Sequence, residues 1–548
     1  MASPIAPLLQ LPHEILDEIL SLLGSPSDLL AFSLASRACA PLVLPNHIEY
    51  RVLRIRTPSN ALWAHLAARQ DLARNIRELR LCRRGDYSAP DRMPTTLVPL
   101  TQGGNLPASA NGSNGSSGRR EEEAEEKRMR DVCTAVGHMT RLETFVWDYE
   151  PDVKAGLRLN HAFEESMLAA LLSAARDVRR VALRGRCAAH VREGRGVSRE
   201  SYPVWEMKGL EELSLYGTGW IAKSNWSHLL RMLQRSPDLE FLEIPFEFHP
   251  LAHLRFQRLK RLKLPMVSGS FTHVHTDLPA QAQRGALAAF LEAHPTIEEL
   301  YWHDLGDFTL PPTALPALRR LKSTIQLWKA LEVPSSSGPR PIEALDVWGL
   351  PAECIAQSKR LDHARLRMVK LTHSDPFEQV RALAERFSGI TWLAVPPRPL
   401  NNAYRQRVEE DASEAAGVVD VELEAWLDLL PRFPKLEVFR GSGIWQAVGD
   451  SGNGSIYRSG IANGWAGGDG DATKERMHRA ILELVRRCPR LRQLDHCQVD
   501  QNRSRVKVVR IFREVEVDRE GEMEERVWYE VQKPCVRDLF DTMGGTFD

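Results

Sequence analysis

Apolar side chains recur along most of this chain in a short string of the form Leu-x-x-Leu-x-Leu, in which x is usually polar or charged. The alternation at the end of each string predicts a short β-strand with one buried face. Six strings occupy residues 76–81, 142–147, 178–183, 210–215, 239–244 and 259–264. Further strings begin at Ile297, Leu318, Ile342, Leu366, Ile390, Leu436 and Leu491.

An amphipathic stretch precedes several of these strings, as in residues 229–233, 287–291, 426–430 and 481–485. A proline then stands two positions before the string, at Pro237, Pro295, Pro434 and Pro489. Proline disfavours helix in the residue before it, so each one predicts the end of a helix and the start of a strand. Four starts, at 318, 342, 366 and 390, are spaced by 24 residues, within the roughly 20–29 residues of a leucine-rich repeat. The pattern predicts stacked helix–strand units that cover each other's apolar faces.

The repeats are irregular, because the asparagine expected eight residues after the first leucine is missing. Thr218, Leu305, Gln326 and Leu350 occupy that position in four copies. An ordinary α/β domain with parallel strands therefore remains an alternative to the leucine-rich-repeat solenoid.

Residues 8–50 predict a separate helical unit. Ile15, Leu16, Ile19, Leu20 and Leu23 recur at three- and four-residue spacing and give one wide apolar face. A break at 24–27 precedes a second helix, for which Ser27 or Asp28 is the expected cap and which carries four apolar residues between 29 and 34. Two such helices have more apolar surface than they can hide from each other. That surface either binds a partner or packs on the rest of the chain.

The same segment resembles the F-box family. The resemblance rests on residues 11–16 (Leu-Pro-His-Glu-Ile-Leu), on the step Asp28-Leu-Leu and on the turn Ala35-Ser-Arg; Ala35 and Cys39 depart from the family pattern. It implies that these helices bind the Skp-type adaptor of a cullin–RING ubiquitin ligase. The positions carried over for that contact are Leu11, Pro12, Glu14, Ile15, Leu16, Ile19, Leu20, Leu29 and Leu30.

The end of the chain changes to strand periodicity. Apolar and polar residues alternate over 506–517 and again over 527–531, on either side of a turn at 518–521. This predicts a β-hairpin that caps the open end of the sheet. The expected organisation is an F-box module at 1–50, a solenoid at 51–504 with flexible insertions near 101–128, 334–341 and 449–472, and a cap and tail at 505–548.

Composition narrows the function classes. The chain has 548 residues with 72 basic and 72 acidic side chains, so no broad positive field favours nucleic acid or an anionic membrane. Its eight cysteines form no C-x-x-C pair, which argues against a zinc site and a disulfide framework. The first residues lack the features of a signal peptide, and no apolar stretch is long enough to span a bilayer. We expect a cytoplasmic or nuclear protein.

Candidate chemistry is sparse. Residues 449–452 (Gly-Asp-Ser-Gly) resemble a serine-protease nucleophile string, 467–471 a single glycine–aspartate calcium repeat, and His273 with His275 an incomplete metal pair. A loop or surface position explains each of them better. The basic residues 255, 258, 260, 261 and 263 are the best nucleic-acid candidate, but a solvated strand face is the favoured interpretation. We expect no enzyme activity, cofactor or small-molecule substrate.

Side chains that alternate with the buried strand positions should face a partner, because strand side chains alternate between faces. Exposed tyrosine and tryptophan among charges are typical of protein-binding surfaces, although Trp348 or Trp392 could instead turn inward to fill the packing. The predicted client-binding residues are Tyr216, Arg261, Lys263, Tyr301, Trp348, Lys370 and Trp392. Glu299, His303, Lys322, Asp346 and Arg440 occupy equivalent positions.

The resemblance implies a substrate-recognition subunit that holds the adaptor through the F-box and a client through the solenoid. One alternative is a protein-binding scaffold whose F-box is not used for ubiquitylation. The other is an enzyme of an unrecognised family on an α/β fold.

Overall fold

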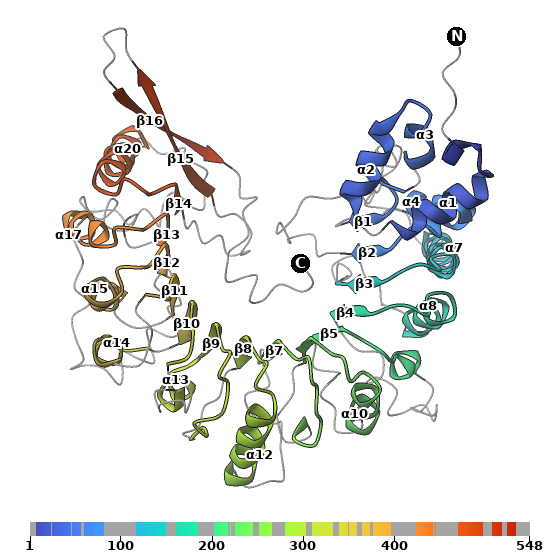
Figure 1. The fold of residues 1–548 in the computed structure, drawn as a ribbon, viewed down its shortest axis with the longest axis horizontal. Helices are drawn as coiled ribbons and strands as arrows, with labels where there is room; N and C mark the ends of the chain where they lie inside the picture. The colour runs from blue at the N-terminus through green and yellow to red at the C-terminus, as the bar shows by residue number, and fades with distance from the viewer. Residues whose placement is uncertain are drawn as a thin grey trace. The chain divides into compact units, whose positions relative to one another are not determined.

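A computed structural model describes the residues that form the repeated elements and the module at the start of the chain (Figure 1). The described residues are 7–23, 25–44, 47–55, 60–81, 117–148, 161–184, 202–216, 220, 225–244, 251–265, 280–302, 309–331, 339–348, 350–358, 364–372, 376–395, 423–441, 444, 470–496, 507–517 and 523–532.

The chain divides into two compact units, and the boundary between them lies at strand β7 (Arg261–Leu264). The N-terminal unit begins with three α-helices and then alternates strands with helices. Its elements are η1 (Pro7–Gln10), α1 (His13–Leu22), α2 (Pro26–Ala35), α3 (Ala40–Val43), β1 (Val52–Ile55), α4 (Asn60–Ala68), α5 (Gln70–Ala73), β2 (Glu78–Leu81), α7 (Ser117–Gly137), β3 (Thr144–Trp147), α8 (His161–Ala174), β4 (Arg180–Arg184), η6 (Pro203–Glu206), β5 (Glu212–Tyr216), α10 (Trp226–Gln234) and β6 (Phe241–Glu243).

The C-terminal unit continues the alternation and closes with two long strands. Its elements are α12 (Ala280–Ala293), β8 (Glu299–Trp302), β9 (Arg320–Thr324), α13 (Ile325–Leu331), β10 (Ala344–Trp348), α14 (Ala352–Gln357), β11 (Met368–Thr372), α15 (Pro376–Arg386), β12 (Trp392–Val395), α17 (Leu423–Leu429), η9 (Leu430–Arg432), β13 (Val438–Gly441), α20 (Gly470–Arg487), β14 (Gln493–His496), β15 (Lys507–Val517) and β16 (Met523–Gln532).

The strands follow one another in the sheet in sequence order. Pairing is parallel from β1 to β6 and from β8 to β14, and antiparallel from β14 to β16. Within each unit the helices lie on one side of these strands (Figure 1). The predicted α/β class is therefore confirmed, with N-terminal helices, a long parallel series and a C-terminal β-hairpin. We call the strand face that points away from the helices the inner face.

The core of each unit is a row of apolar side chains at one register position of successive strands. Each member is almost completely shielded from solvent, as expected for the side of a strand that packs against helices. In the N-terminal unit the row is Leu53, Leu79, Phe145, Val181, Leu213 and Leu242. In the C-terminal unit it is Leu300, Leu321, Leu345, Val369, Leu393, Phe439 and Leu494.

All thirteen predicted strings have a buried first residue, and in each the strand begins two residues later. Strand β1 was not predicted, because Tyr50 occupies the first position of its string in place of an aliphatic residue. Tyr50 is buried like the others.

A backbone ladder joins the starts of successive strands. The carbonyl of Arg319 accepts from the amides of Glu343 (2.7 Å) and Ala344 (3.0 Å), and the carbonyl of Glu343 accepts in turn from Arg367 (2.9 Å) and Met368 (3.0 Å). Two amides share one carbonyl in the same way at Arg51, Arg77, Glu143, Arg179, Glu211, Lys260, Glu298, Arg367, Thr391 and Glu437. Because only main-chain groups take part, the register does not depend on which side chain stands at the position.

Side chains at the same positions pair between neighbouring strands. Arg77 pairs with Glu143, Arg179 with Glu211 at 3.1 Å and Arg319 with Glu343 at 2.7 Å. These side chains are 23% to 59% exposed, so each pair contributes little to stability compared with the buried rows.

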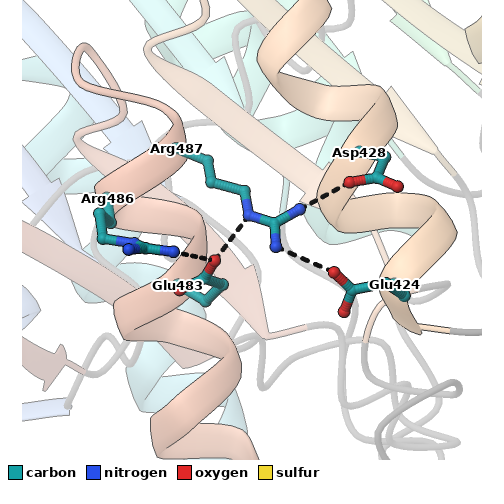
Figure 2. Close-up of polar contacts among 5 residues, drawn as sticks. All are labelled: Glu424, Asp428, Glu483, Arg486 and Arg487. Atoms are coloured by element: carbon teal, nitrogen blue, oxygen red, sulfur yellow. Dashed lines mark hydrogen bonds and ion pairs between the residues drawn. The ribbon is translucent and has the colours of Figure 1, made fainter.

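Helices α17 and α20 are joined by a charged cluster centred on Arg487. Its guanidinium contacts Asp428 at 2.7 Å and Glu424 at 2.9 Å on α17, and Glu483 at 2.6 Å on its own helix (Figure 2). Arg486 also donates to Glu483 at 2.7 Å, and the two arginines lower the pKa of that carboxyl. The cluster links the two helices, although residues 430–469 separate them in the sequence.

The predicted insertions fall mostly outside the described residues. Helix α7 begins at Ser117, so the charged run 119–130 belongs to the helix that leads to the string at Leu142. Helix α20 begins at Gly470.

Candidate protein-binding surfaces

The N-terminal helices close a small core of their own. Leu20, Leu29 and Val43 form a buried cluster, and Leu16 is also buried. Leu23, Phe32, Leu42 and Ile48 pack around that cluster. Helix α2 begins as a capped helix, because the Ser25 hydroxyl accepts from the amides of Ser27 (3.2 Å) and Asp28 (3.4 Å) and Pro26 occupies the first turn. The capping residue is thus Ser25 and not the predicted Ser27 or Asp28.

A second set of apolar side chains on the same helices stays exposed. Ile15 and Leu22 lie seven residues apart on α1, and Leu30 and Leu34 lie four residues apart on α2, so each pair follows one side of its helix. Leu34 is 76% exposed, Leu22 74%, and Ile15 and Leu30 each 49%. Large aliphatic side chains this exposed, in pairs along one side of a helix, are typical of a surface that binds another protein. We call Leu11, Ile15, Leu22, Leu30 and Leu34 the outer leucine surface.

The predicted adaptor-binding residues therefore fall into two groups. Leu11, Pro12, Glu14, Ile15 and Leu30 are exposed, and Ile19 is half-buried. Leu16, Leu20 and Leu29 are buried in the core of the module. The buried group shapes the helices, and the exposed group is available for contact.

The acidic side of α1 is tied to the first repeats. Asp17 contacts His47 and Arg74, each at 2.9 Å, and Glu18 contacts Arg141 at 2.6 Å. His47 is almost fully buried, and burial lowers its pKa below the ordinary value of 6.5 despite the neighbouring Asp17 carboxylate. These contacts hold α1 against the first repeats, while Ile15 and Leu22 on the same helix stay exposed.

The inner face of the C-terminal unit carries a row of polar side chains between the buried rows. Asp346 on β10 lies between Lys322 on β9 and Lys370 on β11, in register. Each lysine Nζ is 3.6 Å from the same carboxylate oxygen, Oδ2 of Asp346. The Lys322 ammonium also lies 4.5 Å from the centre of the Tyr301 ring, within cation–π range. Arg440 continues this register position on β13.

The row two residues earlier is apolar on strands β10 to β13, where it consists of Ala344, Met368, Trp392 and Val438. Ala344 and Trp392 form a buried cluster with Ala394 of the polar row, and Met368 and Val438 pack against it. Trp392 is only 3% exposed. Trp392 therefore packs against its neighbours and is not exposed for contact with a client. The sequence analysis had left this inward orientation open as an alternative.

The inner face of the N-terminal unit also carries buried charge. Glu78 contacts Arg80 at 2.7 Å and Arg54 at 3.8 Å, and Glu243 accepts from the Ser214 hydroxyl at 2.6 Å. Lys263 is 2% exposed and lies 5.1 Å from the centre of the Phe241 ring.

The remaining predicted client-binding residues are less buried or lie beyond the description. Arg261, Tyr301 and Lys370 are partly exposed. Tyr216 and Trp348 end strands β5 and β10, and the orientation of their side chains lies outside the described part of the chain.

The basic residues at 255–263 do not form one free track. Arg255 donates to the Ala252 and Leu254 carbonyls, Arg258 pairs with Glu240, and Lys263 is buried. These interactions favour the structural interpretation of the basic run.

The other candidate chemistry is not assembled where the chain is described. Residues 449–452 and both histidines at 273 and 275 lie outside the described ranges. Within those ranges, His, Cys, Asp and Glu side chains form no group of three or more that could hold a metal ion. None of the helices that the structure describes has an apolar stretch long enough to cross a bilayer.

Comparisons with known proteins add no family assignment: no family model matches the chain, and no curated protein matches it. Strand alternation predicted equivalent positions for Lys322, Asp346 and Lys370, and the structure places the three in register. The contacts of Asp17 and Glu18 with the repeats had no local signal, because their partners lie far away in the sequence.

Proposed function

We propose that this chain is the substrate-recognition subunit of an SCF-type cullin–RING ubiquitin ligase. In this role the helical module binds a Skp-type adaptor, and the repeats hold a client protein for ubiquitin transfer by other subunits. The chain contributes positioning, which raises the effective concentration of the client near the transfer machinery.

The observation that carries the proposal is the outer leucine surface. The module has already closed a core around Leu20 and Leu29, so its exposed leucines are not needed to complete that core. They belong to the segment that resembles an F-box, and an adaptor contact would bury them. The contacts of α1 with Arg74 and Arg141 support the same role, because they hold the helix in place while Ile15 and Leu22 stay exposed.

Charged substitutions on the outer leucine surface test the adaptor contact. Ile15→Lys with Leu30→Lys should reduce co-purification of the Skp-type adaptor at least about tenfold, which corresponds to about 1.4 kcal/mol of binding free energy. An ammonium group buried against an apolar adaptor surface would lack a partner. Both positions are half-exposed, so circular dichroism should show an unchanged fold.

The matched control is Leu482→Lys on α20, where the leucine has a similar exposure of 41%. This variant should retain the adaptor at the level of the unmodified protein. Equal recovery of adaptor with all three proteins would refute the proposed adaptor contact.

A further inference from the structure

The lysine pair on the inner face of the C-terminal unit carries more positive charge than its surroundings balance. Lys322 and Lys370 share one carboxylate, that of Asp346, and neither ammonium lies closer to it than 3.6 Å. Asp346 is 3% exposed, while the lysine side chains are 22% and 24% exposed. The carboxylate is thus buried among the strands. The two lysine side chains reach solvent, and each ammonium group has three N–H donors.

The neighbouring positions of the same row do not remove this excess. Ala394 on β12 brings no charge, and Arg440 on β13 and Asp495 on β14, which are in register, carry opposite charges. Two residues earlier, Arg320 pairs with Glu299 at 2.9 Å and leaves no net charge. We define the cationic strip as Lys322 and Lys370, together with the buried acid Asp346 between them.

We propose that the cationic strip binds an extended acidic segment of the client, through carboxylates that the lysine pair recognises. This deepens the proposed function and rests on it, because it names the chemistry of the client held by the same inner face. The Tyr301 ring beside Lys322 and the packed Trp392 cluster give the strip a firm base, so little side-chain order has to be gained on binding.

The geometry sets the spacing of the carboxylates in that segment. Neighbouring strands lie about 4.8 Å apart. The lysine pair is two steps apart, about 10 Å, which matches carboxylates about three residues apart along an extended peptide.

A continuous phosphate backbone fits the strip less well than separate carboxylates. Asp346 lies between the two lysines and would repel a negative charge placed midway between them. The chain as a whole is also electrically neutral at 72 charges of each sign, so long-range attraction to nucleic acid is absent.

Fluorescein-labelled hexaglutamate is the probe for the test, with hexaglutamine as the neutral comparison, and fluorescence anisotropy on the full chain is the measurement. Lys322→Gln with Lys370→Gln should weaken hexaglutamate binding at least about tenfold, and added salt should weaken binding to the unmodified protein. Arg381→Gln with Arg479→Gln removes the same charge from exposed positions on α15 and α20 and should change binding less than about twofold.

A second variant tests the same strip in the opposite direction. Asp346→Asn removes the repulsive carboxylate, so folded protein carrying it should bind hexaglutamate more tightly. Weaker binding by this variant, despite an unchanged circular dichroism spectrum, would overturn the proposal.

Three other results would also overturn it. These are no binding of hexaglutamate to the unmodified protein, equal losses in the lysine and arginine double variants, and tighter lysine-dependent binding of a single-stranded oligonucleotide of equal charge. Adaptor co-purification by the lysine double variant is measured separately. If this variant still binds the adaptor but no longer binds hexaglutamate, both proposals are supported. If the unmodified protein does not bind the adaptor, the hexaglutamate measurement still tests the lysine pair.

Discussion

His47 shows how the protonation of a single residue bears on the stability of the helical module. Its ring contacts Asp17 on α1 at 2.9 Å, while burial lowers its pKa below 6.5. The folded protein therefore binds a proton at His47 less readily than the unfolded chain does. Stability from this site is present above the unfolded value of about 6.5 and is lost as the pH falls below it. His65, which contacts the Tyr50 hydroxyl at 3.2 Å, has a pKa lowered by burial and contributes in the same direction.

We predict that the thermal unfolding midpoint decreases when the pH is lowered from about 7 to about 5.5. His47→Gln should make this decrease smaller. Glutamine cannot take up a proton but can still donate to Asp17. Differential scanning fluorimetry across this pH range measures the effect. Conservative replacement of an exposed histidine, His13→Gln, is the control and should leave the profile unchanged. A slope that is identical in all three proteins would contradict the assignment.

Main-chain hydrogen bonds align the strands at their first residues. The positions of the strands are also the feature that the sequence predicted best. The first apolar residue of each string, such as Leu318 or Ile342, is buried and sets the strand two residues later. That regularity is local, so a reader of the sequence can find it. The burial of Trp392 and Lys263 could not be predicted in this way, because it depends on side chains brought alongside from other strands.

The backbone ladder predicts a sharp difference between two substitutions at Glu343. Proline has no amide hydrogen and would remove the 2.7 Å bond to the Arg319 carbonyl, so Glu343→Pro should lower the unfolding free energy by at least about 2 kcal/mol. Glu343→Ala keeps the amide and loses only the exposed pair with Arg319, so its effect should be much smaller. Urea denaturation of both variants measures the difference, and similar losses would show that the ladder contributes little.

For the molecule as a whole, the hairpin β15–β16 closes the sheet at its C-terminal end. Strand β15 pairs with β14, and its Val509 and Ile511 are buried, while Arg513 donates to the Val485 and Cys488 carbonyls at the end of α20. An uncovered strand edge beside apolar side chains is a site for self-association. The hairpin thus protects the edge that β14 would otherwise present.

We predict that Val509→Asp with Ile511→Asp detaches the hairpin and causes the protein to associate, because two carboxylates cannot stay buried without partners. Size-exclusion chromatography with light scattering would detect the larger species. Val515→Asp on the same strand is the control, since that side chain is 60% exposed, and it should elute as the unmodified protein does. A variant pair that behaves like the control would mean that the hairpin is not needed as a cap.

At the strand starts of the backbone ladder, two amides donate to one carbonyl of the preceding strand. These bonds align neighbouring strands whatever the number of residues that connects them. Twenty residues separate Leu239 from Leu259, and 66 separate Ile76 from Leu142, yet both pairs of strings occupy the same place in their repeats. A longer connection between strands costs only a slowly growing loop-closure entropy. The stretch between β2 and α7 is therefore a natural place to graft an epitope tag or a fluorescent reporter without disturbing either neighbouring strand.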